Sequence, residues 1–191
     1  SLSVPVVMAF ADDAGSTTVP KTLTVEIFNG NADNVELENA VVADDNGTTV
    51  IEFKGDAWAT YKIALKNPVD LSGKSNVKLF FEYRATGTTS YAEVKPLHFV
   101  SYWNEPVKIA AENLNGFDGY VTKSYDLSDL TDAQMAKFKG FALSTSASFY
   151  IKRVWVEYPN PDYGKEDKPT TEGTYNLIET AVSAAQDSTW E

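Results

Sequence analysis

The chain has 191 residues, of which 43% are apolar and 23% charged, so it is long and apolar enough for one domain with a core and a small appendage. Its formal net charge of −11 argues against nucleic acid or an anionic membrane as a partner, because both bind clustered Lys and Arg. It contains no cysteine and one histidine, which excludes disulfides, cysteine nucleophiles and multi-histidine metal sites.

The first residues allow two interpretations. Residues 2–11 (LSVPVVMAFA) are apolar and end in Ala9-Phe10-Ala11. This is either the remnant of a secretory signal with a small-x-small cleavage site or a first β-strand. The cysteine-free body, rich in Ser, Thr, Asn and Tyr, fits an exported protein. We therefore expect a secreted or cell-surface location.

The middle of the chain is a series of short alternating segments separated by turn signals, which is typical of a sandwich or barrel. Asn46-Gly47 predicts a tight hairpin, because both central positions of such a turn need positive φ. The segments predicted as strands are Thr22–Phe28, Glu36–Ala43, Thr48–Phe53, Ala57–Leu65, Val77–Arg84, Val94–Trp103, Pro106–Ala111, Tyr120–Leu127, Phe141–Thr145 and Phe149–Tyr158. We predict an all-β fold, a two-sheet antiparallel β-sandwich (jelly roll).

Two short helices are predicted beside these strands. Thr131 and Gln134 have the spacing of a capping box, and Gly140 is expected to end the helix that begins there. Beyond a polar, Pro-containing segment, Tyr175–Gln186 has apolar residues at helical spacing and predicts a short C-terminal helix. The expected organisation is an N-terminal strand or signal remnant (1–20), the sandwich (21–158), a linker (159–173) and the C-terminal helix (174–191).

Trp155 has an unusual position in its predicted strand. Side chains alternate between the two faces of a strand, and Val154 and Val156 define one face. Trp155 therefore lies on the other face, between Arg153 and Glu157. A large ring between charges is either covered or holds a flat ligand.

Trp58 breaks the pattern in the same way, because it shares its parity with Thr60 and Lys62. Rings interleaved with charged and amide side chains suit a sugar-binding surface, where a pyranose stacks on an aromatic plane and polar groups bind its hydroxyls. The alternative is that these rings pack in the core or at a sandwich edge. The predicted stacking planes are Trp58, Trp103 and Trp155, with polar contacts from Lys62, Glu82, Tyr102 and Arg153, and Trp190 bordering the site.

Four segments carry a resemblance to a known family. They are residues 55–62 (GDAWATYK), 69–84 with the run VKLFFEYR, 125–130 (YDLSDL) and 149–156 (FYIKRVWV). Together they resemble the galactose-binding-like β-sandwiches among carbohydrate-binding modules of secreted polysaccharide-degrading enzymes. The resemblance implies a non-catalytic module that holds a plant glucan such as starch, β-glucan or xyloglucan. The N-terminus and linker are similar to those of gut and rumen Firmicutes glycan-binding proteins, which implies a bacterial source and neighbouring modules.

Two other functions remain open. One is a structural or scaffolding sandwich in an extracellular complex, with Trp155 beneath a neighbouring module. The other is a small jelly-roll glycoside hydrolase, which needs two carboxylates facing a cleft. Glu157 and Glu172 superficially resemble such segments, although their neighbours do not match.

One cation site is also a candidate. Glu38, Asp44 and Asp45 are oxygen donors near the predicted hairpin, and Ca²⁺ binds through oxygen ligands. We therefore consider a structural Ca²⁺ at these three residues. The alternative is a solvated turn, which Asp and Asn favour without any metal.

Overall fold

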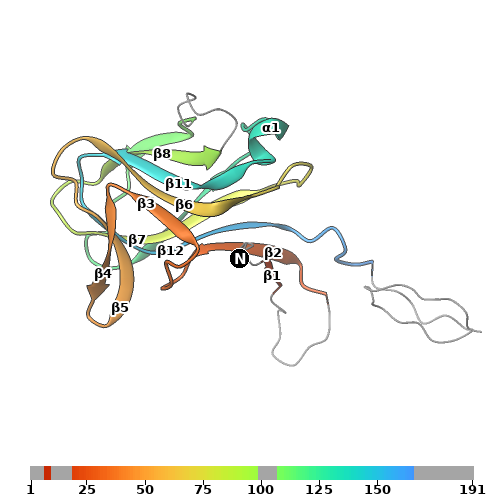
Figure 1. Ribbon diagram of the computed structural model, residues 1–191, viewed down its shortest axis with the longest axis horizontal. Helices are drawn as coiled ribbons and strands as arrows, with labels where there is room; N and C mark the ends of the chain where they lie inside the picture. Colours follow the sequence, from red (N-terminus) through yellow and green to blue (C-terminus); the bar gives the residue numbers. More distant parts are fainter. Residues whose placement is uncertain (1–6, 10–18, 99–106, 166–191) are drawn as a thin grey trace, which may run out of the picture. The chain divides into compact units, whose positions relative to one another are not determined.

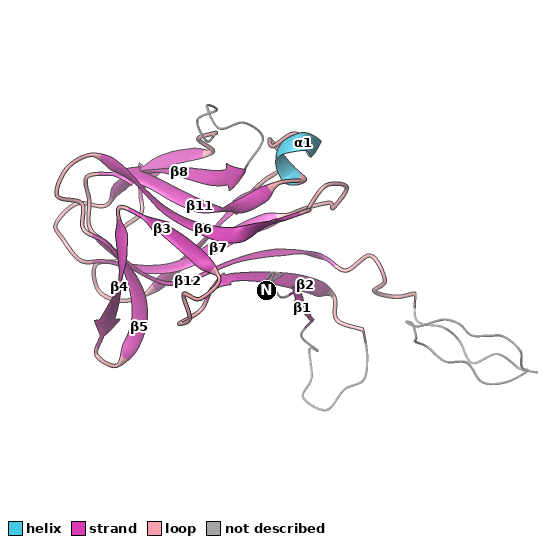
Figure 2. Cartoon of the chain, viewed as in Figure 1, coloured by secondary structure: helices cyan, strands magenta, loops and turns pink. Residues whose placement is uncertain are grey.

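The computed structural model describes residues 7–9, 19–98 and 107–165. Within these ranges the chain forms twelve strands and one four-residue helix (Figure 2). Two compact units can be distinguished, one of residues 1–10 with 22–159 and the other of residues 11–21 with 160–191. The predicted C-terminal helix lies outside the described residues.

The first unit is a sandwich of two antiparallel sheets, which confirms the predicted fold class (Figure 1). In the five-stranded sheet the strand order is β3 (Val35–Glu38), β6 (Ala59–Val69), β11 (Phe138–Thr145), β8 (Tyr91–His98) and β9 (Ala110–Asn113).

The seven-stranded sheet is built around β12 (Phe149–Pro159). One side of β12 pairs with β7 (Lys78–Ala85), which pairs in turn with β10 (Val121–Asp126). The other side pairs in its first half with β5 (Thr48–Phe53) and in its second half with β2 (Thr22–Phe28). Beyond these two lie β4 (Ala40–Asp45) and β1 (Val7–Ala9). Val7–Ala9 within the ambiguous N-terminal segment is thus a strand.

The core lies between the two sheets and follows the predicted alternation. Leu79, Phe81 and Tyr83 of β7 are all 0% exposed. The Phe81 ring lies 4.6 Å from the ring of Phe141 on β11, so aromatic contacts join the sheets directly. Burial of such rings is the main stabilising contribution to a fold without disulfides.

A β-bulge in β12 decides which way its side chains point. Ile151 pairs with Tyr83 and Arg153 pairs with Glu82, so Lys152 is an extra residue on the β12 side. A bulge of this kind shifts the alternation by one residue. Odd-numbered residues of β12 are buried before the bulge and even-numbered ones after it, as the fully buried Ile151 and Val154 illustrate. Without the bulge, Trp155 would point into the core.

The prediction of one strand over Glu36–Ala43 is wrong. Asn39 has φ +57°, which breaks the extended backbone between β3 and β4 and sends the chain from one sheet to the other. Asn tolerates this left-handed conformation better than most residues. Its side-chain amide also donates a hydrogen bond of 2.9 Å to the carbonyl of Thr60.

The capping box is confirmed, but the helix that it opens is short. The Thr131 hydroxyl accepts a bond of 3.2 Å from the Gln134 amide, and the Gln134 side chain accepts one of 2.9 Å from the Thr131 amide. Helix α1 (Asp132–Met135) ends well before Gly140. Gly140 instead lies in β11 next to a register shift, where a Cβ atom would sit 2.2 Å from the carbonyl oxygen of Ile63. The expectation that Gly140 ends the helix is therefore wrong.

The β4–β5 hairpin is as predicted, since Asn46 and Gly47 have φ +51° and +93°. Both values lie in the left-handed region that a two-residue hairpin turn requires.

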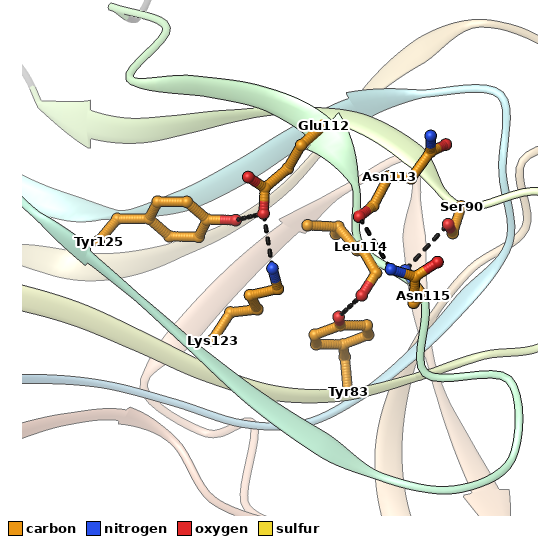
Figure 3. A network of polar contacts seen from close by, with 8 residues as sticks. All are labelled: Tyr83, Ser90, Glu112, Asn113, Leu114, Asn115, Lys123 and Tyr125. Atoms are coloured by element: carbon orange, nitrogen blue, oxygen red, sulfur yellow. Dashed lines mark hydrogen bonds and ion pairs between the residues drawn. The ribbon is translucent and has the colours of Figure 1, made fainter.

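A polar network joins the two sheets at the edge formed by β9 and β10 (Figure 3). The Glu112 carboxylate of β9 accepts bonds from the Lys123 ammonium (2.7 Å) and the Tyr125 hydroxyl (2.9 Å) of β10. Close by, the Tyr83 hydroxyl donates to the Leu114 carbonyl. Strand β9 belongs to one sheet and β10 to the other, so these contacts connect the two layers by side chains.

The described part of the second unit is small. Asn160 donates through its backbone amide to Lys21 (2.8 Å) and through its side chain to Pro20 (2.9 Å), and the Lys21 ammonium lies 5.7 Å from the Tyr163 ring. No described helix has the length and apolar character needed to cross a lipid bilayer.

Candidate functional site

The predicted site residues lie on two different surfaces. Trp155, Arg153 and Glu82 share the outer face of the seven-stranded sheet, which we call the Trp155 face. Trp58 and Lys62 belong to the outer face of the five-stranded sheet, which we call the Trp58 face. The two indoles therefore do not share a face. Tyr102, Trp103 and Trp190 lie outside the described residues.

The Trp155 indole is covered by neighbouring side chains. Trp155 is only 7% exposed, although it points away from the core. The Phe80 ring is stacked on it at 5.1 Å and 11°, and the Arg153 guanidinium lies 4.0 Å from the ring centre. The indole N–H donates a bond of 2.7 Å to Glu157. In this arrangement Trp155 offers no open plane to a ligand.

The charges around Trp155 are paired within the chain. Arg153 donates two bonds, of 2.7 and 2.8 Å, to the carboxylate of Glu26, and this contact raises the pKa of Arg153. The Lys152 ammonium forms an ion pair with the Glu82 carboxylate at 3.6 Å. Bidentate pairs of this kind hold a guanidinium firmly in place. The indole and Arg153 thus form one fixed assembly.

The three predicted cation ligands do not come together. The Asp45 carboxylate accepts bonds from the Tyr120 hydroxyl (2.6 Å) and the Arg84 guanidinium (3.1 Å). These bonds lower the pKa of Asp45, and the bond from Tyr120 has the largest effect. Asp44 accepts from the Gly47 amide in the turn, at 3.1 Å. Glu38 belongs to the other sheet, where it forms an ion pair of 2.9 Å with Lys62.

No three His, Cys, Asp or Glu side chains come close enough to hold a metal ion in the part of the chain that the structure describes. Ca²⁺ needs six or more oxygen ligands. The arrangement therefore fits the solvated, hydrogen-bonded turn better than a Ca²⁺ site.

The Trp58 face carries the most exposed aromatic pair among the described residues. Trp58 is 53% exposed and Tyr91 44% exposed. Their ring centres lie 6.3 Å apart, with the planes tilted by 32°. Trp58 directly precedes β6 and Tyr91 begins β8, so the two rings flank β11 at one end of the sheet.

The loop before β6 has a constrained backbone that positions Trp58. Gly55 has φ +66°, and a Cβ atom at this position would lie 2.2 Å from the carbonyl oxygen of Ala147. Only glycine fits so close an approach. The Tyr61 hydroxyl also donates a bond of 3.2 Å to the Ala57 carbonyl. The exposed indole is therefore attached to an ordered loop.

Polar side chains continue the Trp58 face along the strands. In the next cross-strand row, Thr60, Ser144 and Glu93 are register partners on adjacent strands. The Thr60 and Ser144 hydroxyls are hydrogen-bonded at 2.7 Å. The Glu93 carboxylate forms ion pairs with the ammonium groups of Lys95 (3.7 Å) and Lys108 (3.3 Å). Exposed rings with hydroxyl, carboxylate and ammonium groups beside them can stack a flat ligand and bind its polar substituents.

The sequence prediction missed Tyr91 and Glu93. The strand was expected to begin at Val94, three residues after its actual start at Tyr91. The sequence does contain a signal, because Ala92 and Val94 alternate with Glu93 and Lys95 as the residues of a half-buried strand do.

His98 is the C-terminal residue of β8. Burial lowers its pKa, and neither ring nitrogen has a hydrogen-bond partner among the described residues. This fits a packed strand residue better than a catalytic base.

Comparison with known proteins gives a match in structure only. No protein-family model and no curated protein sequence matches the chain. The fold is similar to a solved family 29 carbohydrate-binding module from Piromyces equi, with a TM-score of 0.52 and 7% identity over 74% of this chain and 93% of that one. It is also similar to a point mutant of a family 29 module, with a TM-score of 0.51 and 12% identity over 72% and 92% of the two chains. At this identity the likeness establishes the β-sandwich fold of these modules.

Proposed function

We propose that this protein is a non-catalytic carbohydrate-binding module and that its Trp58 face holds a plant glucan. The observation that carries the proposal is the exposed pair of Trp58 and Tyr91 on an ordered sheet. The fold shared with family 29 carbohydrate-binding modules supports it. The ligand is a glucan such as starch, β-glucan or xyloglucan.

The physical basis is stacking combined with hydrogen bonding. The C–H face of a pyranose loses contact with water when it lies on an indole or phenol ring. The Thr60 hydroxyl and the Glu93 carboxylate lie in the next row of the same face, where they are suited to bind sugar hydroxyls, while the buried Ser144 hydroxyl between them bonds to Thr60. Two rings form a small platform, so we expect modest affinity. Such a module would be exported and would act beside other modules of the same chain or complex.

Affinity electrophoresis through gels that contain starch, xyloglucan, mixed-linkage glucan or mannan tests the proposal. We expect retardation by at least one glucan. Trp58→Ala and Tyr91→Ala should each weaken the binding about tenfold, or ~1.4 kcal/mol, because each removes one stacking plane. Phe117→Ala is the matched control, because Phe117 is also an exposed ring (41%) but lies in the loop before β10.

Several results would contradict the proposal. If no gel retards the protein, it is not a polysaccharide-binding module, and a scaffolding role becomes the better explanation. If Phe117→Ala weakens the binding as much as Trp58→Ala, the Trp58 face is not the site. Release of reducing ends that Glu157→Gln abolishes would identify a hydrolase instead.

A further inference from the structure

Strand β4 forms an edge of the seven-stranded sheet, and its first four residues lack the usual protection of such edges. Among the described strands it pairs only with β5, and the register between them has no shift from Ala40 to Asp45. Val41 and Val42 are 49% and 50% exposed. Val42 pairs with the buried Ile51 and so points to the core side of the sheet, whereas Val41 points to the outer side. Apolar surface is thus exposed on both faces of the edge.

The other described edge strands are protected. Proteins shield edges by shortness, by charged side chains, especially Lys, by proline or by bulges. Strand β1 has three residues, and β3 and β9 have four each, with Glu36, Glu38 and Glu112 among them. Strand β10 is as long as β4 but carries Lys123. Only β4, of these five, presents four consecutive uncharged residues, Ala40–Ala43.

The charges on β4 allow it to pair with itself in one preferred register. In an antiparallel pair centred on Val42, Val42 faces Val42 of the second copy and Val41 faces Ala43. Asp44 then faces Ala40 and Asp45 faces Asn39, so no carboxylate lies opposite another. A register centred nearer the C-terminal end would oppose the aspartates, and like charges directly opposite are destabilising.

We propose that two copies of this protein associate along β4 through a two-fold axis and join their seven-stranded sheets into one continuous antiparallel sheet. The backbone groups of Ala40–Asp44 that point away from β5 form the ladder between the copies, Val42 packs against Val42 of the second copy, and Val41 packs against Ala43. The association goes beyond glycan binding and does not depend on it. A dimer would also carry two Trp58 faces, which would raise the effective affinity for a polysaccharide chain.

The net charge gives this association a characteristic salt dependence. Each copy carries a net charge of −11, so two copies repel each other at low ionic strength. Salt screens this repulsion, while the backbone ladder and the valine contacts are little affected. The dimer should therefore become more stable as NaCl is added. Association through ion pairs would show the opposite trend.

Sedimentation equilibrium over a wide range of protein concentrations, at low and high NaCl, tests the proposal. We expect a monomer–dimer equilibrium that shifts towards dimer with salt. Val42→Lys should weaken the dimer at least about tenfold, because it places a charge on the pairing edge. Thr49→Lys is the matched control, since it adds the same charge at an exposed position of β5, away from the free edge. Melting temperatures establish that both variants are folded, and Val41→Lys replaces Val42→Lys if the latter fails to fold.

Hydrogen exchange locates the interface. The amides between Ala40 and Asp44 that point away from β5 should gain protection as the protein concentration rises, while those of β10 should not. A monomer under all conditions would overturn the proposal. So would a dimer that Val42→Lys and Val41→Lys leave intact, or one that protects β10 instead of β4. Glycan binding by a strict monomer would overturn the dimer and leave the proposed function standing.

Discussion

The two described tryptophans outside the core have different surroundings. Trp155 is covered by Phe80 and Arg153, and its N–H is bonded to Glu157. Trp58 is 53% exposed and has a ring contact only with Tyr91 among the described residues. Burial and saturated hydrogen bonding give a side chain a role in stability, whereas an exposed ring on an ordered backbone remains open to a ligand.

We expect Trp155→Ala to lower the free energy of unfolding by about 3 kcal/mol, because the substitution removes a buried ring and leaves Arg153 and Glu157 without its contacts. Urea unfolding of the wild type and the variant measures this change. Trp58→Ala serves as the control and should change stability by less than about 1 kcal/mol, since its ring is half exposed. If Trp155→Ala kept its stability and lost glycan binding, the ligand site would lie on the Trp155 face.

At the scale of elements, short interruptions direct the strands. The extra residue Lys152 turns the side chains of β12 by one position, and Asn39 moves the chain from one sheet to the other. The hydrogen bonds of Glu112 then connect the two sheets through their edge strands, β9 and β10. Elements of a sandwich are thus positioned by a few residues that depart from regular strand geometry.

Glu112→Gln should destabilise the protein by about 1 kcal/mol at neutral pH. The loss is limited because the carboxylate is partly exposed and solvent screens its ion pair with Lys123. In the folded protein, bonds from Lys123 and Tyr125 lower the pKa of Glu112. The stabilisation is therefore complete above the pKa of the unfolded chain, 4.5, and disappears as the pH falls through the lower folded-state value.

Thermal unfolding at several pH values measures this effect. The difference in stability between the wild type and Glu112→Gln should shrink as the pH is lowered below about 4.5. Lys108→Met is a control, because it removes an ammonium from a surface ion pair of β8 and not from the connection between sheets. An unchanged difference across this pH range would show that Glu112 does not act through its charge.

At the scale of the whole molecule, the sandwich separates the proposed binding face from the covered Trp155 face. The Trp58 face and the Trp155 face belong to different sheets, with the core between them. Residues without shared contacts contribute almost independently to stability. A substitution on one face should therefore have little effect on the contribution of the other face to stability.

The double variant Trp58→Ala/Trp155→Ala tests this separation. Its loss of stability should equal the sum of the two single losses within about 0.5 kcal/mol. Its loss of glycan affinity should equal that of Trp58→Ala alone. Urea unfolding and affinity gels on the four proteins measure both quantities. A departure from additivity well above about 0.5 kcal/mol would mean that the two faces are energetically coupled through the core.

Much of the strand pattern was predictable from the sequence. The bounds Thr22–Phe28 and Thr48–Phe53 and the turn at Asn46-Gly47 agree with the structure, because they depend on local alternation and local turn geometry. The candidate site was predictable only in part. Trp58 and Lys62 do lie on one face, but their partner Tyr91 comes from a strand that β11 separates from β6.

The sequence by itself determined the all-β class, the alternation of side chains within uninterrupted strand segments, and the placement of Trp155 opposite Val154 and Val156. These follow from the two-residue period of a strand, which neighbouring residues define. Only the tertiary structure decided which sheet each strand joins and which outward ring stays open. Strand order in a sandwich does not follow chain order, and both the Phe80 ring that stacks on Trp155 and the Glu26 carboxylate that holds Arg153 come from distant parts of the chain.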